Sequence, residues 1–198
     1  MAMVQTHDLQ QVYRKLLHSM SRPGTISIME ENVHQSDNGL PCNHASFLTM
    51  MTLLDGEVTF HIISENQTDL YNKISEYTLA KPAPIQEADY IIALRDVSEN
   101  KVIQAMEQCK IGNLIDPQLS ATWIIESETL SNNGELLLTG PGIKEKEQLH
   151  TRFTKNMWQS RNEQTKEHPL GVDVIFTDDI ARIACVPRTT SLSFSEVK

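Results

Sequence analysis

The fold class is decided by residues 58–94, whose sequence is VTFHIISENQTDLYNKISEYTLAKPAPIQEADYIIAL. The first seven of these residues are mostly β-branched or aromatic, which predicts a strand over 58–64. A helix is expected over 67–78, and two prolines then break the chain before a second strand over 88–94. This order of strand, helix and strand is typical of α/β folds.

The same alternation continues on both sides of this segment. Toward the N-terminus, the apolar residues of 7–20 recur every three or four positions, which predicts an amphipathic helix. A short strand over 25–28, a polar loop over 31–39 and a helix that Asn43 caps and Gly56 ends complete this side. Toward the C-terminus, Ser98 is expected to cap a helix that runs through Cys109.

The last third of the chain is richer in strands. Two apolar runs, over 121–127 and 135–139, are separated by Asn132-Asn133-Gly134, and this spacing predicts an antiparallel hairpin. Beyond it we expect a helix over 154–164 and strands over 172–177 and 180–186. Together these elements predict one domain over 1–198, an α/β three-layer sandwich with a mixed sheet.

Composition excludes several classes of function. The chain has 198 residues and a formal charge of −9, with 17 basic and 26 acidic side chains, so we expect it to bind neither nucleic acid nor anionic lipid. Its apolar runs are far shorter than the ~20 residues of a membrane span. The N-terminus lacks the basic start and apolar core of a signal peptide, which predicts a cytoplasmic protein.

Arg188 is the first candidate for a binding residue. It follows the last expected strand and precedes Thr189 and Thr190, and a guanidinium beside two hydroxyls suits a phosphate, a carboxylate or a partner protein. Ligands also tend to bind at strand ends in open α/β sheets. The alternative is that Arg188 forms an ion pair with an acidic residue of this chain.

Two further places could contribute to such a site. Gly140 and Gly142, in the turn before Lys144, could form a nest of backbone N–H groups for an anion, although Gly-Pro-Gly is also common turn chemistry. Asp173 enters a strand after Gly171, where an acid could hold a cation or a substrate hydroxyl. The plainer interpretation of Asp173 is a loop cap or an ion pair with an arginine.

No catalytic residue and no metal site is predicted. The seven histidines lack the HxH, HxxxH and HExxH spacings of metal sites, and the Gly-x-Ser-x-Gly elbow of many hydrolases is missing. The three cysteines are widely separated, which is typical of core side chains in a reducing compartment. Asp178-Asp179 is the adjacent acidic pair beside a strand, and we expect it to form a solvated turn.

Several motifs resemble, in the right order, those of one protein family, the H subunits of the bacterial carbon–phosphorus lyase system (PhnH). The opening stretch YRKLLHSMSRPG, over 13–24, matches the family's aromatic-R-x-L-L-x-x-M-S-x-P-G pattern. The other motifs, in chain order, are Leu53-Leu54-Asp55, Ser120-Ala121-Thr122, Leu138-Thr139-Gly140-Pro141-Gly142-Ile143, Pro169-Leu170-Gly171-Val172-Asp173 and Pro187-Arg188-Thr189-Thr190. The resemblance covers nearly the whole chain, although His168 replaces a usual phenylalanine and 144–167 match poorly.

The resemblance implies a fold similar to the large domain of pyridoxal-phosphate transferases, without their cofactor. It implies action with the G, I and L subunits in making α-D-ribose 1-alkylphosphonate 5-triphosphate from ATP and an alkylphosphonate. It also implies a core complex with the G, I and J subunits. No active site of its own is established for this subunit, so no catalytic role is carried over to any residue.

Two other functions remain open at this point. A transferase that uses pyridoxal phosphate would need a well-placed lysine for the Schiff base, and the sequence offers no obvious one. A small anion-sensing module would depend on the glycine turn before Lys144. The leading hypothesis is an assembly subunit that forms a homodimer when it is made alone.

Overall fold

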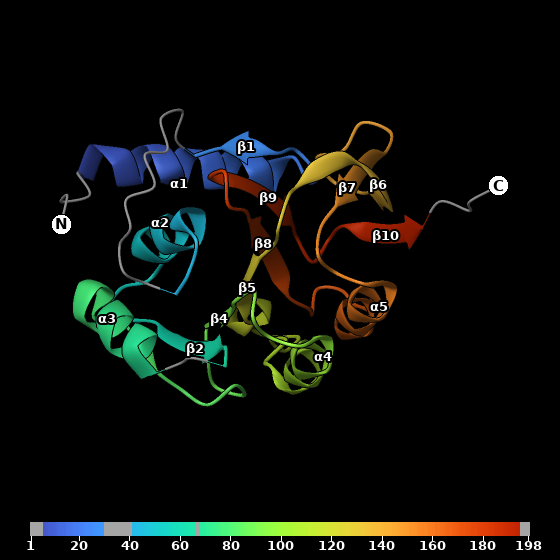
Figure 1. Cartoon of the computed structure of the whole chain (residues 1–198). Helices are drawn as coiled ribbons and strands as arrows, with labels where there is room; N and C mark the ends of the chain where they lie inside the picture. Colours follow the sequence, from blue (N-terminus) through green and yellow to red (C-terminus); the bar gives the residue numbers. More distant parts are fainter. Residues whose placement is uncertain (1–5, 30–40, 66–67, 195–198) are drawn as a thin grey trace.

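A seven-stranded mixed sheet forms the centre of the computed structural model, which describes residues 6–29, 41–65 and 68–194 (Figure 1). The predicted loop over 31–39 lies outside the described residues. The strands are, in sheet order, β1 (Ser27–Ile28), β9 (Arg182–Val186), β8 (Asp173–Thr177), β5 (Thr122–Glu126), β4 (Tyr90–Ala93), β2 (Thr59–Ile63) and β3 (Lys81–Pro82). The five from β8 to β3 are parallel, whereas β9 and β1 pair in antiparallel fashion.

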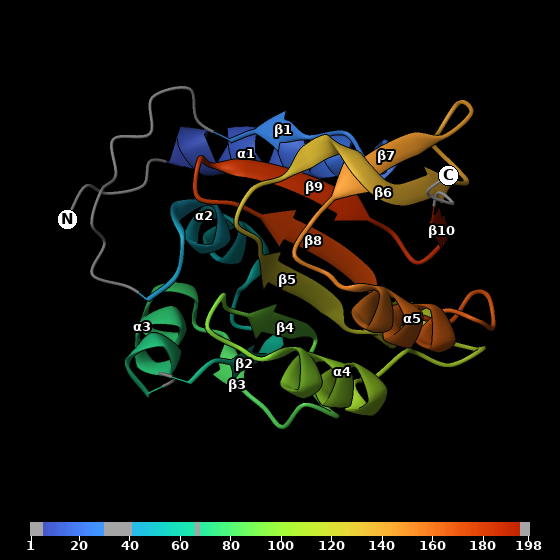
Figure 2. The same ribbon diagram turned by 45° about the vertical axis from the view of Figure 1, so that its right-hand side comes forward.

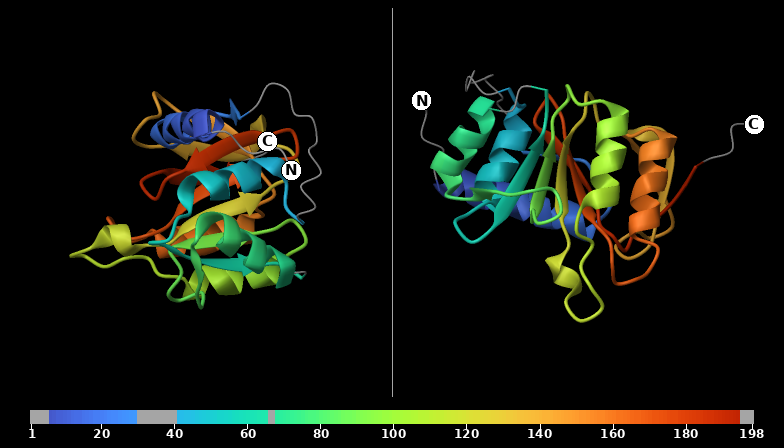
Figure 3. Two further views of the ribbon diagram at one scale, coloured as in Figure 1. Left: turned by 90° about the vertical axis from the view of Figure 1, so that its left-hand side faces the viewer. Right: turned by 90° about the horizontal axis from the view of Figure 1, so that it is seen from below.

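Helices cover both faces of this sheet, as the turned views show (Figures 2 and 3). One face carries α1 (Thr6–Ser21), α2 (His44–Leu53) and α3 (Thr68–Thr78), and the other carries α4 (Glu99–Gln108) and α5 (Lys155–Gln164). Successive residues of β5 divide between the two sides, because side chains alternate across a strand. Trp123 and Ile125 pack in the core beneath α4 and α5, while Ile124 packs in the core beneath α2 and α3. The predicted α/β sandwich with a mixed sheet is confirmed.

A second, smaller sheet was not predicted. It is antiparallel, in the order β10 (Ser191–Phe194), β6 (Ser131–Thr139) and β7 (Glu147–His150). Its apolar residues Leu136, Leu138 and Leu149 join the core on the side of α4 and α5. The small sheet therefore packs on the same face of the large sheet as α4 and α5.

The predicted hairpin between 121–127 and 135–139 is wrong. β5 pairs in parallel with β4 and β8, whereas β6 pairs with β7 and β10 in the other sheet. Asn132-Asn133-Gly134 lies inside β6, where the register with β7 shifts between Ser131 and Leu136. A Cβ on Gly134 would lie 2.5 Å from the carbonyl oxygen of Leu149. Residues typical of a turn here mark a bulge and a close backbone approach.

The helix starts follow the sequence closely. The side chain of Asn43 accepts a hydrogen bond from the Ser46 N–H at 2.7 Å and so caps α2, as predicted. Thr154 caps α5 by accepting from the Met157 N–H at 3.3 Å. Ser98 precedes α4 without a side-chain capping bond. The sequence patterns did not predict the strands β3, β7 and β10. Of these, β7 lies in the polar stretch over 144–167.

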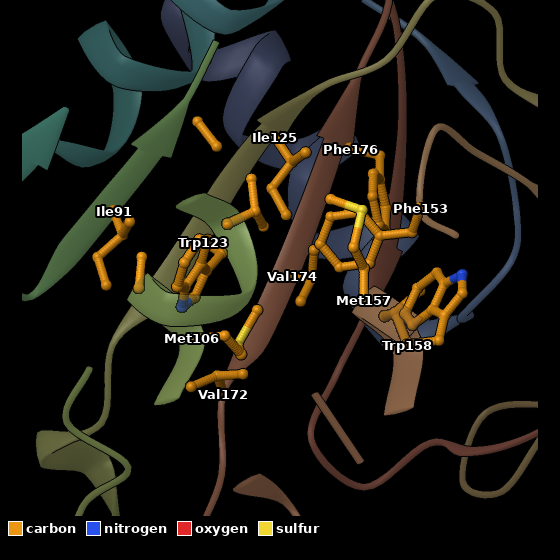
Figure 4. Close-up of a cluster of buried hydrophobic side chains, with 14 of the residues drawn as sticks. Ile91, Met106, Trp123, Ile125, Phe153, Met157, Trp158, Val172, Val174 and Phe176 are labelled. Atoms are coloured by element: carbon orange, nitrogen blue, oxygen red, sulfur yellow. The ribbon is translucent and has the colours of Figure 1, made fainter. Parts of the chain in front are cut away.

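An aromatic cluster fixes α5 against the sheet (Figure 4). The ring centroid of Phe153 lies 5.0 Å from that of Trp158 and 5.2 Å from that of Phe176, with the rings close to perpendicular. Such edge-to-face pairs add to the free energy of burial. Because Phe176 belongs to β8, the cluster holds the segment before α5 at the end of the parallel strands.

Candidate functional site

A pocket lies at the carboxyl edge of the parallel strands. The segments that follow β4, β5 and β8 meet there with the start of α2, and the pocket has a volume of about 530 Å³. Its lining residues are Pro41, Cys42, Asn43, Arg95, Asp96, Glu126 and Asp179. Open α/β sheets bind ligands at this edge, and the volume is in the range of small-molecule sites.

Glu126 is the buried acid of this pocket. It is the last residue of β5. Its Oε1 accepts a hydrogen bond from the backbone N–H of Asn43 at 2.6 Å, and its Oε2 accepts one from the backbone N–H of Arg95 at 3.2 Å. Burial raises the pKa of Glu126, although both N–H donors act in the opposite direction. The carboxyl group thus joins the start of α2 to the end of β4.

Arg152 closes the same edge from the segment between β7 and α5. Its Nη1 donates to the carbonyl oxygens of Leu94 at 2.9 Å and Glu126 at 3.3 Å, and its Nη2 donates to that of Val97 at 2.8 Å. Burial lowers the pKa of Arg152. One guanidinium therefore satisfies backbone carbonyls at the ends of two neighbouring strands.

The acidic pair Asp178-Asp179 is not a solvated turn, and that expectation is wrong for Asp178. The Asp178 side chain is fully buried and accepts from Arg182 Nε at 2.8 Å, as well as from three backbone N–H groups. Asp179 forms an ion pair with Arg95, and the two side chains are 42% and 44% exposed. The first acid closes the β8–β9 turn, and the second lies at the mouth of the pocket.

The remaining polar groups of the pocket are also engaged. Asp96 Oδ2 accepts from Ser64 Oγ at 2.8 Å and from the Glu65 N–H at 2.9 Å.

Burial, together with the neighbouring Glu126, raises the pKa of the Cys42 thiol to about 12, which disfavours a thiolate nucleophile at neutral pH. Within the described residues, no group of three or more His, Cys, Asp or Glu side chains could hold a metal ion.

Asp173 and Arg188, which the sequence identified as separate candidates, lie at the opposite, amino edge. Because β9 is antiparallel to β8, the end of β9 lies beside the start of β8, and the argument from strand ends does not apply to Arg188. Arg188 Nη2 lies 2.5 Å from Asp173 Oδ2, and the Arg188 N–H donates to Asp173 Oδ1 at 2.7 Å. Arg188 Nη1 donates to the Pro117 carbonyl at 2.7 Å. The intrachain ion pair is the alternative that the structure contains.

The other sequence-predicted residues lie near this edge in different settings. Gly140 has a φ of +129°, and a Cβ there would lie 3.0 Å from the carbonyl oxygen of Thr189. Gly142 also has a positive φ, and a Cβ there would overlap the carbonyl oxygen of Ser21 at the end of α1. Close backbone packing explains both glycines.

The hydroxyl residues and the lysine differ in exposure. Lys144 and Thr189 are exposed, whereas Thr190 is buried and its carbonyl accepts from Arg161 Nη1 at 3.0 Å. Arg161 is itself buried, and burial lowers its pKa to about 10. The structure therefore brings Gly140, Thr189 and Thr190 together. Neither these three residues nor Lys144 line the pocket at the carboxyl edge.

The sequence did not identify the residues at the carboxyl edge as the lining of one pocket, because no motif marks them. One signal was present in the sequence: Glu126 is a carboxylate inside the apolar run ATWIIES, where an acid is costly unless it is satisfied. Arg95 and Arg152 come from distant segments, and only the fold brings them to the same edge.

The chain resembles known proteins along its length. Residues 3–193 match the family described as "Bacterial phosphonate metabolism protein (PhnH)". A relative from Stutzerimonas stutzeri, named "Putative C-P lyase subunit protein HtxG", is 24% identical over 189 residues, which cover 93% of this chain and 85% of the relative. Among the helices of the described residues, none is long and apolar enough to cross a membrane.

Proposed function

Because the chain belongs to the PhnH family of bacterial phosphonate metabolism proteins, as its motifs predicted, we propose that it serves as a subunit of a carbon–phosphorus lyase complex. The observation that carries this proposal is the extent of the family match, which includes every described helix and nearly all of β10. The relative named as a putative C-P lyase subunit aligns over a similar length and supports it.

Within that complex, we assign this chain a supporting role rather than a catalytic one. The polar groups of the carboxyl-edge pocket are bound to the chain itself: Glu126 to two backbone N–H groups, Asp96 to the end of β2, and Arg95 to Asp179. A general acid or base has to reach a substrate atom that exchanges a proton. Polar groups that are bound within the chain instead stabilise its fold, which suits a subunit with a structural role in the complex.

The proposed reaction belongs to the assembly as a whole. We propose that this chain is needed with the G, I and L subunits to make α-D-ribose 1-alkylphosphonate 5-triphosphate from ATP and an alkylphosphonate, with release of adenine. The proposal places it in a cytoplasmic core complex with the G, I and J subunits and as a homodimer when alone. Its mixed sheet between two helical layers supports a relation to the large domain of pyridoxal-phosphate transferases. We propose that this chain functions without their cofactor.

The test is a reconstitution. Adenine release from Mg²⁺-ATP and methylphosphonate is measured with the G, I and L subunits, with and without this chain, and with this chain alone. We expect turnover only in the full mixture. Full turnover in the mixture that lacks this chain would contradict the proposal, and adenine release by the chain alone would make it an enzyme in its own right.

A further inference from the structure

A projecting loop carries the most exposed large apolar side chain of the described residues. Residues 112–120, between α4 and β5, extend away from the amino edge of the sheet in both views of Figure 3. The exposed fractions are 66% for Leu114, 89% for Ile115 and 51% for Leu119. Single exposed apolar residues are ordinary, but three within six residues at a projecting tip indicate a contact surface.

Hydrogen bonds within the loop hold its tip in shape. Asn113 Oδ1 accepts the N–H groups of Ile115 at 2.9 Å and Asp116 at 2.7 Å, and a short 3₁₀ helix, η1 (Pro117–Leu119), follows. Gly112 has a φ of +80°, and a Cβ there would lie 2.6 Å from the Pro117 carbonyl oxygen. The loop is therefore folded back closely on itself.

The ion pair at the amino edge fastens this loop to the body of the protein. Arg188 donates to the Pro117 carbonyl at 2.7 Å while its other nitrogen atoms contact Asp173 at the start of β8. An antiparallel bridge between Ile111 and Ser120 closes the base of the loop. A pre-ordered loop loses less conformational entropy when it binds, so its apolar side chains contribute more to affinity.

The tip is too small to form a stable interface by itself, whichever protein it contacts. Three aliphatic side chains present roughly 300 Å² of apolar surface, whereas a stable interface needs about 800 Å² from each partner. A convex tip of this size instead suits insertion into a concave groove as the anchor of a larger contact. Because Asp116 lies in the tip and the chain carries a charge of −9, a basic rim would complement it.

We propose that loop 112–120 is a docking element that inserts Leu114, Ile115 and Leu119 into an apolar, basic-rimmed groove on another subunit of the phosphonate-processing assembly. This inference rests on the proposed function and names the surface through which that function is exercised. It also gives Arg188 a role, because the guanidinium positions the loop through the Pro117 carbonyl.

The test compares two exposed isoleucines at opposite edges of the sheet. Ile115→Asp places a charge at the tip, and Ile180→Asp makes the same change in the β8–β9 turn, where Ile180 is 58% exposed. The G, I and J subunits are co-expressed and purified. The affinity of each tagged variant for these subunits is then measured by biolayer interferometry. We expect Ile115→Asp to weaken binding ~30-fold or more and Ile180→Asp to change it less than ~3-fold.

The outcomes separate this inference from the proposed function. If the unaltered chain binds the subunits and Ile115→Asp binds equally well, the docking loop is wrong and the subunit role stands. If the unaltered chain binds none of them, the proposed function fails and the docking loop fails with it. If Ile115→Asp converts an isolated dimer to a monomer without weakening subunit binding, the loop contacts a second copy and the inference is overturned. Circular dichroism checks that each variant is folded.

Discussion

The two edges of the central sheet use charged side chains in different ways. At the carboxyl edge, Glu126 and Arg152 bind backbone groups around a pocket, and the half-exposed pair of Arg95 and Asp179 lies at its mouth. At the amino edge, Arg188 is bound by an acid of β8 and fastens a projecting loop. The difference teaches that a charged residue after a strand has no fixed role, because the direction of the strand decides which edge it reaches.

The largest expected effect comes from substituting the two adjacent acids at the carboxyl edge one at a time. Asp178→Ala should lower the free energy of unfolding by about 3–5 kcal/mol, because it leaves Arg182 and three backbone N–H groups without their acceptor. Asp179→Ala removes a half-exposed ion pair and should cost about 0–1 kcal/mol. Urea denaturation followed by circular dichroism measures both.

The second expected effect compares one arginine from each edge. Arg188→Ala should cost about 1.5–3 kcal/mol of stability, because its Asp173 and Pro117 contacts are mostly shielded from water. Arg95→Ala should cost about 0–1 kcal/mol, because its ion pair is exposed to solvent. Thermal and urea unfolding of the two variants give the comparison.

Amide hydrogen exchange adds a local measure to that comparison. Exchange within 112–120 should become faster in Arg188→Ala and stay unchanged in Arg95→Ala, since only Arg188 contacts the loop. Equal losses of stability from the two variants, with no change in the loop, would remove the distinction between the edges.

Local patterns in the sequence predicted the helices and four of the five parallel strands well. The apolar periodicity of α1 and the cap residue Asn43 act within a few residues, so they can be read without the fold. The small sheet was missed because β6 pairs with β10, more than fifty residues later, and Asn132-Asn133-Gly134 has the composition of a turn. Pairing between distant segments is not encoded by local propensity.

The candidate site was predicted less well, for a related reason. Asp173 and Arg188 were both identified, but their pairing and their edge depend on β9 running antiparallel to β8. Glu126 was not identified, because its role depends on N–H groups contributed by Asn43 and Arg95. In both cases the side chains were visible in the sequence, and the strand directions that give them their function were not.

The smallest expected effect is a change in pH dependence at Glu126. Burial raises the pKa of this carboxyl group above its ordinary value of 4.5, so the folded state binds the proton more tightly than the unfolded chain does. The stability that this proton contributes is present in full below the ordinary pKa and is lost as the pH rises through the raised one. Glu126→Gln carries no such proton. The free energy of unfolding of the unaltered protein, minus that of Glu126→Gln, should therefore fall in urea titrations as the pH rises above the ordinary pKa of 4.5 and through the raised one. A difference that instead grows with pH would mean that the Asn43 and Arg95 N–H groups outweigh burial, and that the carboxyl edge is built around a stabilised charge.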